Sequence, residues 1–155
     1  MTQLVLPAEV GDDERVSRYV LFSGWVRQDQ TLKPDAFIPY PRPNLSVTRQ
    51  HGLDDAGVWR YGHQVARART RGMLGRADFS CAAARQVSLD VVADPLPGNP
   101  NHANVTKWPE DKPGQKIRAQ LLAQAASYIR APECTDSGPA ASELGSDSRE
   151  RTQET

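Results

Sequence analysis

The stretch Val87-Ser-Leu-Asp-Val-Val-Ala-Asp94 is the most strand-like part of this 155-residue chain. It is rich in β-branched and apolar residues, which favour a pleated, half-buried backbone. The residues that follow, Asp94-Pro-Leu-Pro-Gly-Asn-Pro-Asn101, are typical of turns and end the run sharply. The pattern therefore predicts a strand over 87–94, followed by a long loop, and it places a β-sheet in the fold.

Three further segments have strand patterns. Arg18-Tyr-Val-Leu-Phe22 is a short run of aromatic and β-branched residues. Leu45-Ser-Val-Thr-Arg49 alternates apolar and polar residues, so Ser46 and Thr48 would share one face of a strand and the other three side chains the opposite face. His102-Ala-Asn-Val105 is a candidate strand that is too short to judge from periodicity alone.

Two segments have helix patterns. Asp54-Asp55 can cap a helix over 56–73, because their carboxylates would lie at the positive end of its dipole. Pro113-Gly114 begins a second helix that we expect to extend to Arg130. Its apolar stripe consists of Ile117, Leu121, Leu122, Ala125 and Ile129. Strands and helices in this order predict an α+β fold: a small mixed or antiparallel sheet packed by two main helices.

The composition divides the chain into three parts. Residues 15–131 carry the strand and helix patterns and are expected to form one α+β domain, because 155 residues leave no room for two. Residues 1–14 are expected to be a partly disordered N-terminal segment. Residues 132–155 are rich in Ser, Gly, Pro and acids and have almost nothing apolar to bury, which predicts a disordered tail.

The charge is unevenly distributed although the whole chain is formally neutral. The tail contains six acidic residues and two arginines, so it carries about −4 and the remainder about +4. Overall neutrality excludes a globally basic nucleic-acid binder. The acidic tail could still fold loosely over a basic surface of the domain.

The sequence shows no membrane segment and no secretory signal. No window approaches 18 uninterrupted apolar residues, and the first residues lack a basic start followed by an apolar run. We therefore expect a cytoplasmic protein with no membrane partner. Cys81 and Cys134 could pair only between the domain and the predicted tail, so both are interpreted as free thiols.

Known metal and cofactor motifs are missing from the sequence. The three histidines and two cysteines include no CxxC, HxH or HExxH pair, so no metal site is predicted. Neither GxxxxGK nor GxGxxG occurs, so a phosphate-binding loop of a known kind is not expected, and no cofactor is predicted.

A set of short motifs resembles a loose group of small uncharacterised bacterial proteins. The motifs are Ala36-Phe37 with Pro39, then Leu45-Ser46-Val47, then Asp94-Pro95-Leu96, and then Asn99-Pro100-Asn101-His102-Ala103. The resemblance spans roughly residues 18–130 and implies a bacterial source. It carries no catalytic assignment, but it marks Ser46 and His102 as positions of interest.

Ser46 and His102 are also the candidate catalytic residues. A serine nucleophile needs a base that is itself oriented, and these two side chains with an acid such as Asp90 or Asp94 supply the required residue types. His102 follows a loop of prolines and asparagines, where side chains are often presented to a ligand. The alternatives are a strand serine with local hydrogen bonds and a histidine that bonds to nearby backbone.

The predicted helix over 56–73 has a cationic face. Arg60, Arg67 and Arg71 fall within about 40° of one another on a helical projection, and His63 lies beside them. Arginine is well suited to bidentate contacts with phosphate or carboxylate groups. This face is a candidate binding site for a phosphate-bearing ligand, a nucleic acid or a partner protein. The alternative is a solvated helix face paired with local acids or with the acidic tail.

Two functional hypotheses follow, and the sequence does not decide whether the protein is an enzyme. The first is a small binding or accessory protein that uses the arginine-rich face. The second is a small enzyme acting on a nucleotide or NAD-like ligand, with chemistry similar to ADP-ribosyl transfer and with Ser46 and His102 in its site. Arg18, with Ser46 and Thr48, would fill two of the places such an enzyme needs. No glutamate follows on a late strand, so His102 would have to serve instead. A deep pocket lined by Ser46, His102 and an arginine would favour an enzyme.

Overall fold

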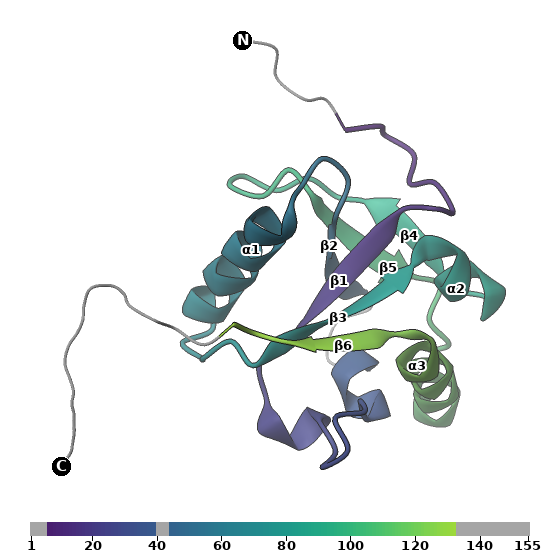
Figure 1. Cartoon of the computed structure of the whole chain (residues 1–155). Coiled ribbons are helices and arrows are strands. Elements are labelled where there is room, and N and C mark those ends of the chain that lie inside the picture. Colours follow the sequence, from purple (N-terminus) through teal and green to yellow (C-terminus); the bar gives the residue numbers. More distant parts are fainter. Residues whose placement is uncertain (1–5, 40–43, 133–155) are drawn as a thin grey trace, which may run out of the picture.

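The secondary structure alternates short strands with helices in the computed structural model, which describes residues 6–39 and 44–132 (Figure 1). The strands are β1 (Arg15–Val20), β2 (Leu45–Arg49), β3 (Gly75–Ser80), β4 (Asp90–Ala93), β5 (His102–Thr106) and β6 (Ser127–Arg130). The helices are α1 (Asp55–Ala68), α2 (Cys81–Gln86) and α3 (Lys112–Ala125), with two 3-10 turns, η1 (Ser23–Trp25) and η2 (Pro34–Phe37).

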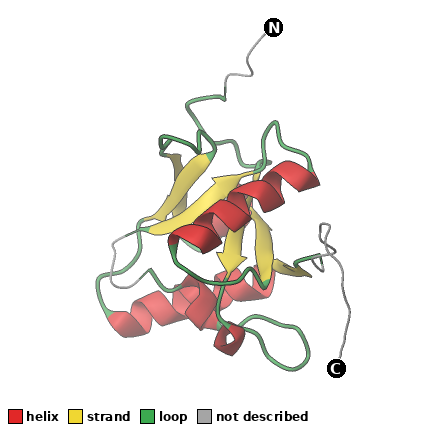
Figure 2. Cartoon of the chain, turned by 90° about the vertical axis from the view of Figure 1, so that its left-hand side faces the viewer, coloured by secondary structure: helices red, strands yellow, loops and turns green. Residues whose placement is uncertain are grey.

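The six strands form one antiparallel sheet in the order β4-β5-β2-β1-β3-β6. Helices lie on both of its faces, with α1 on one face and α3 on the other (Figures 1 and 2). The predicted α+β class with two main helices is therefore confirmed, and the sheet is antiparallel. Residues 1–5 of the N-terminal segment and nearly all of the predicted acidic tail lie outside the described residues.

The two faces of the sheet bury different side chains because successive residues on a strand point to opposite sides. On the α3 side, Val16 of β1 and Phe79 of β3 pack with Phe37 and Leu122 in the larger apolar core. On the α1 side, Tyr19 and Leu21 pack with Val58 and Ala66 in a smaller cluster. This smaller cluster holds α1 against the half of the sheet that contains β1 and β3.

Helix α1 begins where the sequence predicts but ends earlier. The side chain of Asp54 accepts a hydrogen bond from the Gly57 N–H at 2.8 Å, which caps the first turn. The helix ends at Ala68 rather than near Met73, because Thr70 adopts a left-handed backbone with φ of 57°. Arg71 therefore lies in the loop after the helix and not on its cationic face.

The segment predicted as one helix from Pro113 to Arg130 forms a helix and a strand in the structure. Helix α3 ends at Ala125, and residues 127–130 form β6, in which Ile129 pairs with Arg76 of β3. Tyr128 and Ile129 are residue types that favour a strand, and Ala126 already has an extended backbone. The predicted stripe was therefore only partly right: Leu122 is fully buried, whereas Ile117 is 60% exposed and Leu121 is 41% exposed.

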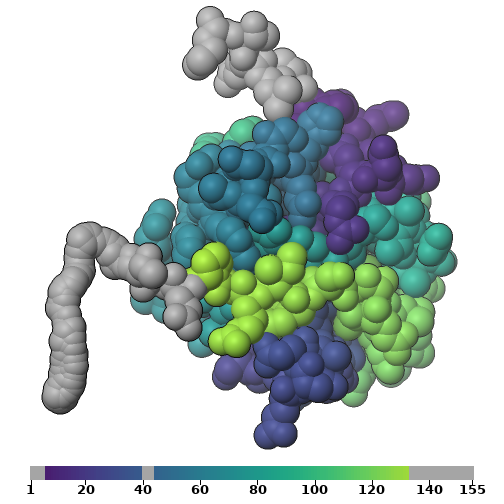
Figure 3. All heavy atoms as spheres, in the orientation of Figure 1, coloured from purple at the N-terminus to yellow at the C-terminus, as the bar shows by residue number. Residues whose placement is uncertain are grey.

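The predicted strand over 87–94 is shorter than expected. Residues 81–86 are mostly small and form α2, which Ser80 caps by accepting from the Ala83 N–H at 3.1 Å. Ser88 then reverses the chain with a left-handed φ of 67°, so β4 begins only at Asp90. The edge strands β4 and β6 are both short, and β6 is visible at the surface in Figure 3.

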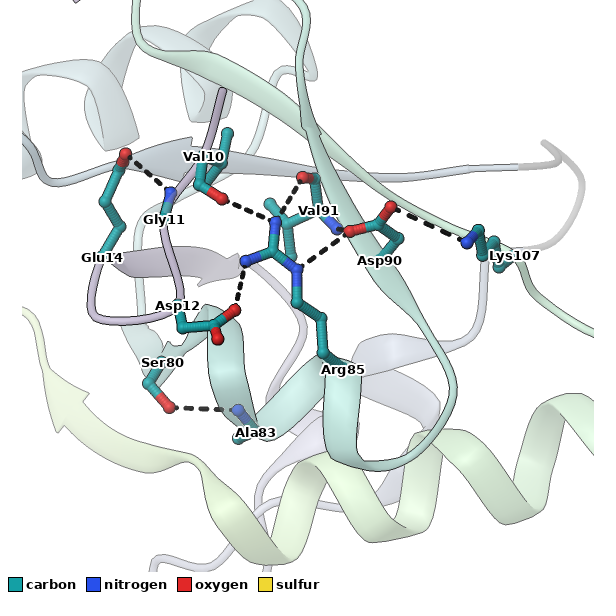
Figure 4. A network of polar contacts seen from close by, with 10 residues as sticks. All are labelled: Val10, Gly11, Asp12, Glu14, Ser80, Ala83, Arg85, Asp90, Val91 and Lys107. Carbon is teal, nitrogen blue, oxygen red and sulfur yellow. Dashed lines mark hydrogen bonds and ion pairs between the residues drawn. The ribbon is translucent and has the colours of Figure 1, made fainter. Parts of the chain in front are cut away.

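Residues at the end of the N-terminal segment contact the domain that the sequence places after residue 14. Val10 is buried, and its carbonyl accepts from Arg85 at 2.6 Å (Figure 4). Arg85 also forms ion pairs with Asp12 at 2.6 Å and with Asp90 at 3.0 Å. This network joins the N-terminal segment to α2 and β4. Within the described residues, no helix has the length and apolar character that a membrane span requires.

Candidate active site

A cavity of about 270 Å³ lies beside α1, on the half of the sheet that α1 leaves uncovered. Its lining comes from β1, β2, β5, the segment after β1, the second half of α1 and the loop after β4. Its lining includes Arg18, Phe22, Trp25, Ser46, Arg69 and His102. The strand residues that line the cavity include Ser46, which is exposed, and Thr48, which is buried.

The structure brings Ser46 and His102 together in this cavity. Thr48 of β2 pairs with His102 of β5, and Ser46 pairs with Asn104, so Ser46 and His102 are diagonal neighbours on one face of the sheet. The Oγ atom of Ser46 lies 3.1 Å from Nε2 of His102. That distance is a hydrogen bond between a candidate nucleophile and a candidate base.

Asp94 orients the histidine ring. Its backbone N–H donates to the carbonyl of His102 at 2.9 Å, and its own carbonyl lies 2.8 Å from Nδ1 of His102. Because a carbonyl oxygen can only accept, Nδ1 carries a proton, and Nε2 of the neutral ring is free to accept from the Ser46 hydroxyl. The Asp94 carboxylate lies 3.3 Å from Nδ1 as well, and Asn104 donates to it at 3.0 Å.

This geometry decides which acid accompanies the pair. The sequence left Asp90 and Asp94 as alternatives, and only Asp94 contacts His102. Asp90 is turned toward Arg85 instead, and the hydrogen bond from Arg85 holds the pKa of Asp90 below its usual range. The contacts therefore run from the Ser46 hydroxyl to Nε2 of His102 and from Nδ1 to the backbone carbonyl of Asp94, with the Asp94 carboxylate 3.3 Å from the same nitrogen. In a serine triad a carboxylate side chain takes the place that the Asp94 carbonyl has here.

Arg18 is the charged group on the β1 side of the cavity. Its Nε donates to the carbonyl of Ala36 at 3.0 Å and its Nη1 to the carbonyl of Ser46 at 3.2 Å. Burial, with repulsion from Arg69, lowers the pKa of Arg18 to about 10, so the guanidinium stays charged at neutral pH. Within residues 6–39 and 44–132, no carboxylate forms an ion pair with Arg18.

Aromatic rings complete the wall next to Arg18. The ring centroids of Phe22 and Trp25 are 4.7 Å apart. The guanidinium carbon of Arg18 lies 5.6 Å from the centroid of Trp25, and that of Arg71 lies 3.9 Å from the centroid of Phe22. Each contact is within the range of a cation–π interaction. The rings therefore place two guanidinium groups around one aromatic pair.

The residues of the predicted cationic helix face lie apart from the cavity. Arg60, His63 and Arg67 are exposed on α1 and do not line it, and Arg60 lies over its neighbour Tyr61 at 5.9 Å. Arg71 lies beyond the helix, so the expected convergence of three arginines on one helical line is wrong. Arg71 instead contacts Phe22 near the cavity.

Sequence reasoning named Arg18 but missed Arg69 and the aromatic residues of the site. Trp25 and Arg69 line the cavity, but neither lies in a motif, and they are 44 positions apart in the sequence. The sequence does mark Arg18, because a charged residue within a strand of largely apolar residues is unusual. Burying such a charge costs free energy unless it has hydrogen-bond or charged partners.

Other nucleophile and metal chemistry has little support in the described residues. Burial raises the pKa of the Cys81 thiol to about 11, so it is not a ready nucleophile at neutral pH. Across residues 6–39 and 44–132, no three His, Cys, Asp or Glu side chains come close enough together to hold a metal ion. Cys134 lies outside this part of the chain.

Comparisons with known proteins identified no relative of this chain. No family model matches the chain, and no similar protein was found among curated proteins or solved structures.

Proposed function

We propose that this protein is a small serine hydrolase that cleaves an ester or a related acyl compound. Ser46 is the nucleophile, His102 is the general base and acid, and Asp94 holds the histidine ring in the required tautomer. The observation that carries the proposal is the chain of contacts from Ser46 Oγ through both nitrogens of His102 to Asp94, next to a cavity. Such a chain supplies the activated nucleophile that acyl transfer needs.

In the first half of the reaction, the Oγ of Ser46 forms a bond to the carbonyl carbon of the substrate. Its proton passes to Nε2 of His102, and the carbonyl electron pair moves onto oxygen. When the tetrahedral intermediate collapses, the bond to the leaving alkoxide breaks and that oxygen takes the proton from Nε2. The acyl group then remains as an ester on Ser46.

The second half of the reaction releases the acid. A water molecule attacks the acyl carbon while Nε2 of His102 takes one of its protons. The bond to Ser46 then breaks, and Oγ recovers that proton, so the free carboxylic acid leaves and the enzyme returns to its first state. Arg18 donates to the backbone carbonyl of Ser46, and we propose that its positive charge also stabilises the negative charge that develops on the carbonyl oxygen of the substrate.

The cavity limits the size of the substrate. Its volume of about 270 Å³ is near the lower end for small-molecule sites, so a short acyl group fits better than a long chain. Among the described residues, no aspartate or glutamate side chain lines it. ADP-ribosyl transfer usually requires such a carboxylate on a late strand, so the gathering of Arg18, Ser46 and His102 supports acyl transfer better.

The test is hydrolysis of 4-nitrophenyl acetate and butyrate by purified protein. We expect Ser46→Ala and His102→Gln each to lower kcat/KM at least 100-fold, because each removes a group that acts in bond formation. Ser127→Ala is the matched control, since Ser127 is an exposed strand serine at the far edge of the sheet. A fluorophosphonate probe should add its mass to the Ser46 peptide of the wild type only. Equal hydrolysis by Ser46→Ala and Ser127→Ala would refute the proposal.

The exposed arginines of α1 support a second proposal, that this helix binds a phosphate-bearing partner. Arg60 and Arg67 are both exposed and form no ion pair within the described residues. If they contact nucleic acid, binding of labelled single-stranded RNA should weaken steeply with salt, because each neutralised phosphate releases condensed counterions. We expect Arg60→Glu with Arg67→Glu to abolish that binding without unfolding the protein. If the double variant binds the RNA as tightly as the wild type does, this helix face is an ordinary solvated surface and the second proposal is wrong.

A further inference from the structure

Two arginines of the cavity have no ion-pair partner among the described residues. In this part of the chain Arg18 donates only to backbone carbonyls, and Arg69, which follows α1, lines the same cavity. Their mutual repulsion contributes to the lowered pKa of Arg18. Neither residue forms an ion pair within residues 6–39 and 44–132. Two neighbouring guanidinium groups without a counter-charge raise the free energy of the empty site, and an anionic ligand would lower it.

The positive charge continues beyond the first cavity. A second hollow of about 950 Å³ shares Arg18, Ser46 and Arg69 with the first and adds Arg71 to its lining. Asp35 is the only carboxylate among the described residues that line either hollow. Three guanidinium groups therefore face one carboxylate around the candidate nucleophile.

Backbone contacts orient the guanidinium group of Arg18 before any ligand binds. The carbonyls of Ala36 and Ser46 accept from Nε and Nη1, and Trp25 lies against the guanidinium. No described side chain accepts a hydrogen bond from Nη2 of Arg18. An arginine held in this way loses little side-chain entropy when it binds an anion.

We propose that the acyl part of the substrate carries a compact anionic group, a carboxylate or a phosphate, which Arg18 and Arg69 bind. This inference rests on the proposed hydrolysis at Ser46, because it names the substrate class of that same site. The contact of Arg18 with the Ser46 carbonyl places the anion site next to the nucleophile. The anion and the scissile carbonyl therefore belong to one short molecule.

Three matched esters test the substrate class. They are the 4-nitrophenyl esters of butyric, succinic and 3-phosphonopropionic acids, which share chain length and leaving group and differ only in a terminal methyl, carboxylate or phosphonate. We expect kcat/KM to be at least tenfold higher for a charged ester than for the butyrate, as charge-assisted hydrogen bonds imply. The carboxylate and phosphonate arms show which anion the site prefers. Equal kcat/KM for all three would overturn the inference.

Variants show which residues produce the preference. Arg69→Gln removes an exposed charge, so it should fold normally, and it should reduce the ratio of kcat/KM between charged and neutral esters toward one. Arg18→Gln should do the same, with circular dichroism to confirm folding. Arg130→Gln is the matched control: this arginine is exposed on β6 and lines neither hollow, so it should keep the preference. An equal loss in Arg130→Gln would mean that only overall charge matters.

A binding arm separates this inference from the proposed hydrolysis. Isothermal titration of the Ser46→Ala protein uses the three matching 4-nitroanilides, which cannot be turned over in that variant. We expect at least tenfold tighter binding of a charged anilide than of the butyryl compound, and loss of that difference in Ser46→Ala with Arg69→Gln. Selective binding without ester hydrolysis in the wild type would reject the hydrolase and keep the anion site. Hydrolysis without charge selectivity would reject the anion site alone.

Discussion

Glu14 and Arg49 form a buried ion pair. Nη2 of Arg49 lies 2.7 Å from the Glu14 carboxylate, and the two side chains are 2% and 9% exposed. Arg49 also donates to the carbonyl of Pro7 at 2.9 Å, so its guanidinium joins β2 to the N-terminal segment. Removing one partner of such a pair leaves a buried charge without compensation, and that is costly.

This pair predicts a pH dependence of stability. Burial alone would raise the pKa of Glu14, but the hydrogen bond and charge of Arg49 lower it below its usual value. A carboxyl with a lowered folded-state pKa stabilises the fold fully above its unfolded pKa, about 4.3, and loses that contribution as the pH falls through the folded pKa.

We expect Glu14→Gln to lower the free energy of unfolding by about 1 to 3 kcal/mol at pH 7. The difference from wild type should shrink as the pH falls below about 4, because the wild-type carboxyl is then protonated as well. Urea unfolding at several pH values measures both effects. Glu9→Gln is the control, since Glu9 is exposed in the same segment. A destabilisation that is the same at pH 3 and pH 7 would contradict the ion-pair explanation.

At the scale of elements, the rotation of α3 about its axis determines which of its two neighbouring leucines is buried. Leu121 and Leu122 are neighbours in sequence, yet Leu122 is fully buried and Leu121 is 41% exposed. Ala119 and Ala123 lie on the buried side with Leu122, and this face packs against the turn η2. Small residues beside one leucine allow the helix to approach the sheet closely.

We expect Leu122→Ala to lower the free energy of unfolding by about 2 to 5 kcal/mol, because it leaves a cavity in the larger core. Leu121→Ala should cost less than about 1 kcal/mol, since much of that side chain is already in water. Chemical denaturation of both variants gives the comparison directly. Equal costs would show that α3 is rotated about its axis relative to the described structure.

At the scale of the whole molecule, the cavity exists because one sheet face is covered unevenly. Helix α1 packs on Tyr19 and Leu21 and leaves the neighbouring half of the same face to the loop after β4. Figure 2 shows α1 crossing the sheet while the other helices lie on the far side. Polar strand residues at Ser46 and His102 can face this space because no helix needs to bury them.

The sequence by itself determined the class of the fold and the residue types of the candidate site. Short strands and two helical segments predicted an α+β domain, and alternation along β2 placed Ser46 on the face opposite Leu45 and Val47, as observed. These features are local, since strand alternation and helix caps depend on neighbouring residues alone. The sequence also proposed Ser46 with His102, although no pattern of spacing could show that they meet.

Only the tertiary structure determines that Ser46 and His102 are in contact and where several helices and strands end. The register between β2 and β5 brings Ser46 to His102 across 56 residues of chain, and it selects Asp94 over Asp90. Residues 127–130 became a strand because β3 offers backbone partners, which outweighs the continuing helical periodicity. Long-range hydrogen bonds and packing determine these features, and they have no counterpart in the order of residues along the chain.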